Sequence, residues 1–165
     1  TCSRGHLLRL DELALHRSPV VVYEPSSTIR DSAAWKVLEL VEALSSHGYK
    51  AEPFALLMGT VTRAEYVVDV LVHRSGKRFA VLVFNKSNFS PESFSRPITL
   101  ALDLQMPILV LMSKEYAEGV TKFLRQEGKS EQRIQNLFPS ELVRIVIYEN
   151  EADMVVKLLN ALEKL

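Results

Sequence analysis

Two residues with complementary chemistry stand out in a strongly apolar part of the chain. Asp69 interrupts the apolar run 66–73, and Lys86 stands where the next apolar run, 78–85, ends. Carboxylate oxygens are ligands for Mg²⁺, and a lysine beside such an ion can stabilise charge that develops on a reacting phosphate. This pairing predicts metal-assisted cleavage of phosphodiesters, with Asp69 and Lys86 as catalytic residues and Asp69 as metal ligand.

A tight turn would bring these two residues together. Both runs are rich in β-branched and aromatic residues, which predicts two strands, and Ser75-Gly76 suits a two-residue hairpin loop. In that register Asp69 faces Leu82. Glu65 faces Lys86. Because side chains alternate with period two along a strand, we expect Asp69, Glu65 and Lys86 on one face of the sheet.

The predicted site is poor in metal-binding oxygens. Phe84 is expected on the same face, two residues before Lys86, and a phenyl ring cannot bind a hard cation. Asn85 points to the opposite face unless a bulge turns it. We therefore expect a degenerate site, little or no cleavage and no cofactor. If the site is active, it needs Mg²⁺ and a carboxylate from Glu39, Glu42 or Glu65.

Basic and polar side chains gather around the same hairpin. Such groups bind phosphate oxygens, so we predict them as nucleic-acid-binding residues: Arg74, Lys77, Arg78, Lys86 and Asn88. The whole chain carries 20 basic and 20 acidic residues, so it is not a strongly basic protein. A structural role for Asp69 and Lys86, as buried or ion-paired side chains, stays open.

The remaining pattern predicts the elements that position these residues. A helix starting after Asp31 or Ser32 should end at Gly48, and a loop at 90–95 should precede a short helix at 98–105 with Pro97 in its first turn. The other predicted elements are an edge strand with Pro53 at 49–58, a buried strand at 107–112, a helix capped by Ser113, a helical turn at 130–137, a strand at 142–148 and a last helix capped by Asn150.

The order of these elements predicts an α/β fold. From residue 107 onward, strands alternate with helices, which implies parallel strands joined by right-handed crossovers. The upstream hairpin is antiparallel. We therefore expect a mixed β-sheet with a central antiparallel hairpin, flanked by helices.

Length and composition indicate an ordinary globular protein. The chain has 165 residues, of which 47% are hydrophobic and 24% charged. We expect an N-terminal extension at 1–30, with a short helix and strand, and one α/β domain at 31–165. The lone Cys2 excludes a disulfide within the chain. No apolar run reaches ~18 residues, so we expect an intracellular protein that does not bind membranes.

These residues together carry a family resemblance. The chain resembles the restriction-endonuclease-like superfamily with its PD-(D/E)xK motif, and its layout is similar to the Mrr-type branch. His47-Gly48-Tyr49 matches a turn after the leading helix, Asp69 matches the acid on the second strand, and Lys86 matches the lysine. Phe84 departs from the motif. The resemblance implies the mixed-sheet fold and a nuclease-like site.

Several interpretations stay open. The first is a nucleic-acid-binding or assembly module with a degenerate nuclease site, and the second is an active Mg²⁺-dependent DNA or RNA nuclease. The third follows from a resemblance to flavodoxin-like domains, including TIR-type domains, and is a protein-interaction module. Residues 19–24, the helix that ends at Gly48 and the segment 97–113 carry that likeness. Expected partners are therefore nucleic acid or another protein.

Overall fold

A computed structural model describes residues 32–85, 90–124 and 130–164. The predicted extension at 1–30 lies outside these residues, and so do Lys86 and Asn88. The described elements, in chain order, are α3 (Ala33–Ser46), β1 (Lys50–Met58), β2 (Glu65–Arg74), β3 (Lys77–Phe84), α4 (Pro91–Leu104), β4 (Ile108–Ser113), α5 (Lys114–Leu124), α6 (Ser130–Gln135), β5 (Val143–Tyr148) and α7 (Glu151–Glu163). None of the described helices is long and apolar enough to cross a membrane.

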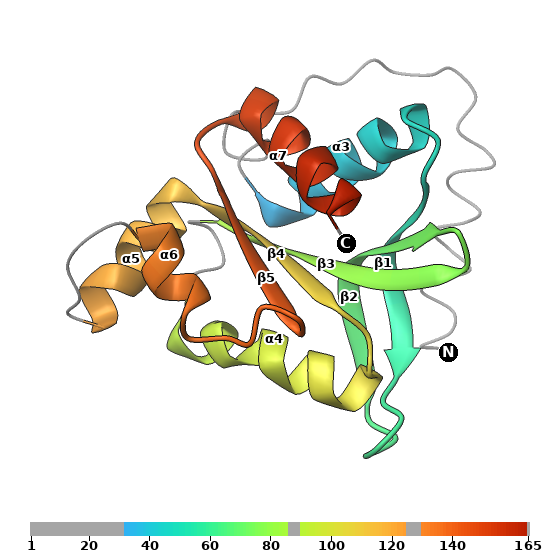
Figure 1. Cartoon of the computed structure of the whole chain (residues 1–165), viewed down its shortest axis with the longest axis horizontal. Coiled ribbons are helices and arrows are strands. Elements are labelled where there is room, and N and C mark those ends of the chain that lie inside the picture. Colours follow the sequence, from blue (N-terminus) through green and yellow to red (C-terminus); the bar gives the residue numbers. More distant parts are fainter. Residues whose placement is uncertain (1–31, 86–89, 125–129, 165) are drawn as a thin grey trace, which may run out of the picture.

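The strands form one mixed sheet in the order β1-β2-β3-β4-β5. The pairs β1–β2 and β2–β3 are antiparallel, whereas β3–β4 and β4–β5 are parallel. Figure 1 shows β4 and β5 crossing the molecule beside the longer β2–β3 hairpin. The predicted mixed sheet with a central antiparallel hairpin is confirmed. The flavodoxin-like alternative is wrong, because the first three strands are not parallel.

Helices cover both faces of this sheet. α3 and α7 lie on one face, and α4, α5 and α6 lie on the other (Figure 1). Every residue of β4 is buried, as expected for a strand covered on both faces. Lys36 on α3 is also buried and lies 3.4 Å from a carboxylate oxygen of Glu151, which joins α3 to α7.

Local signals explain where most elements begin and end. Ser75 and Gly76 both have positive φ, 49° and 78°, as a type I′ hairpin turn requires. The Ser32 hydroxyl accepts a hydrogen bond from Trp35 N–H at the start of α3, and Gly48, with φ 85°, follows its end. Ser113 and Asn150 cap α5 and α7 as predicted.

The prediction for α4 was wrong at its start. The helix begins at Pro91 rather than near Ile98 and contains Pro97 in its interior. Ser90 is the N-cap, its hydroxyl accepting from Ser93 N–H at 3.1 Å, and Pro91 stands in the first turn, where its missing N–H costs nothing. Pro97 was therefore misread as the start of a helix that was already under way.

A single aspartate attaches α4 to the turn between β1 and β2. The Asp103 carboxylate accepts hydrogen bonds from Val61 N–H and Thr62 N–H, both at 2.9 Å, and from Tyr66 OH at 2.6 Å. The Thr62 hydroxyl donates to it as well. Gly59 passes so close to this carboxylate that an added Cβ would overlap it. The attachment fixes the position of α4 against β2.

Side chains occupy the outer edge of β5. Gln135 on α6 donates to Val143 O at 2.9 Å and accepts from Ile145 N–H at 2.7 Å, as a neighbouring strand would. Lys157 on α7 donates to Ile147 O at 2.7 Å, and Glu131 accepts from Ile147 N–H at 3.3 Å. These four backbone groups along the edge are therefore already paired.

Candidate functional site

Asp69 marks the point where β2 leaves β3. The hairpin pairing runs from Arg74 and Lys77 to Val70 and Val81, and β2 then continues along β1. The Asp69 carboxylate accepts a hydrogen bond from Val83 N–H at 2.7 Å, so a side chain takes the role of a strand carbonyl there. The irregularity therefore falls at Asp69 and not at Asn85, where a bulge was considered.

The strands turn sharply at this fork. Phe54 and Asp69 interrupt the β1–β2 register between the pairs Pro53–Val70 and Ala55–Val68, and Phe54 has a left-handed φ of 51°. Val68 packs in the core beneath α4, whereas Val70, two residues later, packs in the core beneath α3. Residues two apart on a regular strand share a face, so the strand rotates between them.

The β2–β3 pairing that the structure describes stops at Val70, one pair short of the expected pair of Asp69 with Leu82. The expected pair of Glu65 with Lys86 is untested, because Lys86 lies outside the described residues, and on its other side Glu65 is opposite Met58 of β1. Glu65 is exposed. Glu39 and Glu42 lie on α3, which packs on the face that also holds Val70. These three glutamates do not gather into a cluster with Asp69.

Burial dominates the electrostatics of Asp69. Loss of water raises the pKa of its carboxyl group, while the Val83 N–H and the positive charge of Arg96 act in the opposite direction. Arg96 lies on α4, and its guanidinium donates to Val67 O. The sequence interpretation missed Arg96 because the segment before Ile98 was not expected to be helical. The available signal was the pair Ser90-Pro91, an N-cap followed by a proline in the first turn, which would have placed Arg96 inside a helix.

Phe84 stands in the core and not beside a cleft. Its ring is buried, and its centroid is 5.0 Å from that of Tyr116. The Tyr116 hydroxyl is 2.6 Å from Ser93 Oγ. Asn85 follows the strand and is 3% exposed. The position that the resemblance assigns to a carboxylate is therefore apolar and enclosed.

The described residues do not fit a magnesium centre. None of their His, Cys, Asp and Glu side chains form a group of three or more that could hold a metal ion. Mg²⁺ is held by oxygen ligands, but the Asp69 carboxylate binds a backbone N–H and Phe84 offers none. Lys86, the second predicted catalytic residue, lies outside the described residues.

The basic residues of the hairpin lie at its other end. Lys77 and Arg78 are exposed beside the turn. Arg74 is engaged, since it donates to Leu162 O at 2.9 Å at the end of α7 and lies over the Tyr49 ring. A strand rises ~3.3 Å per residue, so Lys77 is roughly 23 Å from Phe84 along β3. The predicted site thus divides into a fork at Asp69 and a basic hairpin end.

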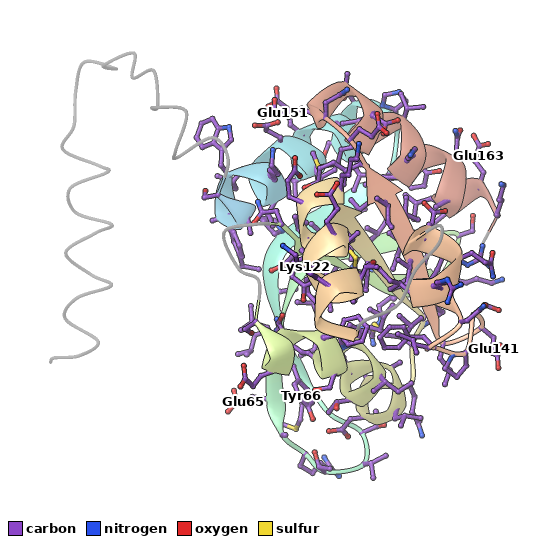
Figure 2. The ribbon with its side chains drawn as sticks, turned by 90° about the vertical axis from the view of Figure 1, so that its left-hand side faces the viewer. Glu65, Tyr66, Lys122, Glu141, Glu151 and Glu163 are labelled. Atoms are coloured by element: carbon purple, nitrogen blue, oxygen red, sulfur yellow. The ribbon has the colours of Figure 1, made fainter. Side chains whose placement is uncertain are left out.

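A pocket adjoins the basic hairpin end. It has a volume of about 710 Å³ and lies between the hairpin turn, the loop from α4 to β4, the start of β5 and the end of α7. Arg144 and Lys164 line it together with the hairpin residues, and Glu141 and Glu163 contribute acids. Figure 2 shows these two glutamates on the opposite side of the view from Glu65 and Tyr66. No local motif marks Arg144 or Lys164 in the sequence.

The order of strands and helices can be compared with the fold that the sequence analysis expected. A five-stranded mixed sheet with an antiparallel hairpin at its centre and helices on both faces has the restriction-endonuclease-like arrangement that the sequence resemblance implied. No protein-family model and no curated protein sequence matches the chain.

Several solved structures are similar to the chain, among them the following three. AF1548, a protein of unknown function, has a TM-score of 0.51 at 11% identity over 80% of this chain and 67% of its own. An XisH family protein from Nostoc punctiforme has a TM-score of 0.45 at 16% identity, over 74% of this chain and 94% of its own. An fdxN element excision controlling factor protein from Anabaena variabilis has a TM-score of 0.43 at 18% identity, over 72% of this chain and 93% of its own. At these identities the similarity concerns the fold alone.

Proposed function

We propose that this chain is a nucleic-acid-binding module whose nuclease-like site does not cleave. The observation that carries the proposal is the Phe84 ring, packed against Tyr116 where a metal-binding carboxylate is expected. Asp69 fits the same interpretation, because a buried carboxylate bound to Val83 N–H holds two strands together at the fork. The Mrr-type resemblance belongs to this proposal and is supported by the Gly48 turn and by Asp69 on β2.

Binding is assigned to the basic hairpin end. Lys77 and Arg78 are exposed there, and Arg144 and Lys164 line the adjoining pocket. Cationic side chains on neighbouring elements supply the phosphate contacts that make most of the affinity for nucleic acid. The net charge of the chain is zero, so this local excess of cations has to be matched by acids elsewhere.

A binding assay with a matched control tests the assignment. Lys77→Gln with Arg78→Gln should weaken retention of nucleic acid in a mobility-shift assay. Each lost phosphate contact should lower the salt slope by about 0.7–0.9. Lys114→Gln with Lys122→Gln removes the same charge from exposed positions on α5 and should leave binding unchanged. Failure of the wild-type chain to retain single- or double-stranded DNA or RNA at low salt refutes the proposal.

A cleavage assay tests the second half of the proposal. The wild-type chain should leave DNA and RNA intact with Mg²⁺ or Mn²⁺. The competing hypothesis of an active nuclease predicts metal-dependent cleavage that both Asp69→Asn and Lys86→Ala abolish while the fold stays intact. Observing that pair of losses would show that a carboxylate outside position 84 completes the site.

Assembly with a protein partner is a second candidate, and one surface favours it. Five large apolar side chains are exposed on β1, on β2 and in the turn between them: Phe54, Leu56, Met58, Val61 and Val67. Contiguous exposed apolar side chains mark interaction surfaces in many proteins. Sedimentation of the wild-type chain and of a Leu56→Ser variant would detect self-association through this surface.

A further inference from the structure

Two pockets meet at Arg144. The pocket of about 710 Å³ at the hairpin end shares Ser140, Arg144 and Lys164 with a second pocket of about 490 Å³ between α6 and α7. The second pocket follows the outer side of β5 as far as Lys157. Together they form a groove, here called the Arg144 groove, that runs from the hairpin turn to the β5 edge.

Arg144 has a nitrogen that the described residues leave without a partner. Its Nε is buried and has no hydrogen-bond partner among them. A buried donor without an acceptor costs free energy, and guanidinium groups bind phosphate oxygens through a fixed fork of donors. Arg144 projects from β5, which is paired along its length with β4, so the strand holds it in place. It is the best-placed anion ligand in the groove.

The charge of the groove also favours an anion. Its lining holds six basic residues and three acidic ones in a chain whose net charge is zero. Two of the cations are partly engaged, since Arg74 donates to Leu162 O and Lys157 pairs with Asp153 at 3.3 Å. Glu131 is engaged as well, through Ile147 N–H. Lys77, Arg78 and Lys164 are exposed.

The β5 edge argues against a peptide as the occupant. A peptide that adds to a sheet needs unpaired backbone groups on the edge strand. Gln135, Glu131 and Lys157 already pair with the backbone of Val143, Ile145 and Ile147. A ligand of the groove therefore has to be recognised by charge and shape.

We propose that the Arg144 groove binds single-stranded nucleic acid, with a phosphate on Arg144 and Lys164 and one nucleoside in each flanking pocket. Each pocket is within the size range of small-molecule sites, and apolar side chains of Phe79, Met106 and Pro107 line the larger one. In a single strand the nucleosides are free to enter such pockets, whereas in a duplex they are stacked and paired. The inference rests on the proposed function and narrows it to one strand form.

Fluorescence anisotropy with labelled oligonucleotides of one sequence tests this. The full chain should bind the single strand about tenfold more tightly than the duplex, because only the nucleosides of a single strand are free to enter the two pockets. Arg144→Gln should weaken single-strand binding about tenfold or more, because it removes a charged hydrogen-bond donor to the phosphate. The control is Arg133→Gln, which removes one positive charge from an exposed position of α6 outside both pockets.

The outcomes separate this inference from the broader proposal. Equal affinity for single strand and duplex overturns the inference, and so does an Arg144→Gln loss no larger than that of Arg133→Gln. If Lys77→Gln with Arg78→Gln still weakens binding in either case, the proposed function survives. Absence of all binding overturns both. If circular dichroism shows that Arg144→Gln does not fold, Lys164→Gln, at an exposed position, takes its place in the test. It should weaken single-strand binding more than Arg133→Gln does.

Discussion

Restoring a carboxylate at position 84 should unfold the chain rather than create a nuclease. Phe84 is 3% exposed and packs against Tyr116 in the core. Removing a buried Phe side chain costs about 3–5 kcal/mol, and placing an unpaired polar group there adds about 1–3 kcal/mol. Phe84→Gln should therefore lose much of a total stability that is about 5–15 kcal/mol for a typical domain.

The negative charge should make Phe84→Glu less stable at neutral pH than Phe84→Gln. Burial raises the pKa of a carboxyl group, and each tenfold weakening of the acid corresponds to about 1.4 kcal/mol. The additional cost is present above the raised pKa and disappears as pH falls below the unfolded value of about 4.3. Urea unfolding of Phe84→Glu and Phe84→Gln should therefore differ at pH 7 and converge near pH 4, with Phe84→Leu as the mild apolar control.

A stable Phe84→Glu variant would refute this reasoning. If its free energy of unfolding at pH 7 equals that of Phe84→Gln and rises with added Mn²⁺, position 84 opens to a metal site that the packing against Tyr116 does not predict. Gain of metal-dependent cleavage in the same variant would have the same meaning.

Two other polar contacts give further predictions. Asp69→Asn keeps an oxygen for Val83 N–H and removes a buried charge, so its free energy of unfolding at pH 7 should equal or exceed that of the wild type, whereas Asp69→Ala should cost about 1–3 kcal/mol. Hydrogen bonds from Thr62 and Tyr66 lower the pKa of Asp103. The ionised Asp103 therefore stabilises the folded chain above pH ~4, and this contribution is lost as pH falls below that value. Asp103→Asn should therefore flatten the acid limb of a thermal-unfolding series, and Gly59→Ala, which pushes into the same carboxylate, should lower Tm at neutral pH.

The predictable part of the fold is local. The β2–β3 hairpin follows from Ser75-Gly76, whose two positive φ angles suit that turn, and from the apolar runs on either side. The uninterrupted apolar sequence of β4 predicted burial on both faces. The caps at Ser113 and Asn150 could be predicted because they are also local. Each side chain accepts a hydrogen bond from the backbone N–H three residues later.

What could not be predicted depends on contacts between distant segments. The β2–β3 pairing ends before Asp69 although β2 stays paired with β1 on both sides of this residue, and no local pattern near Asp69 marks that change. Arg96 reaches Val67 only because Asp103 fixes α4 against the turn between β1 and β2. Arg144 comes from β5 and Lys164 follows α7, so the groove exists only in the folded chain.

The side chains along β5 also limit how far the sheet could extend from one molecule to the next. Edge strands with unpaired backbone groups are templates for polymerisation. In the part of the chain that the structure describes, β1 pairs with β2 alone, whereas the outer side of β5 is occupied by Gln135, Glu131 and Lys157. Two copies that joined their β1 strands would present β5 at both outer ends. Growth through these sheet edges would then stop at two molecules, and a fibre could not form by this route.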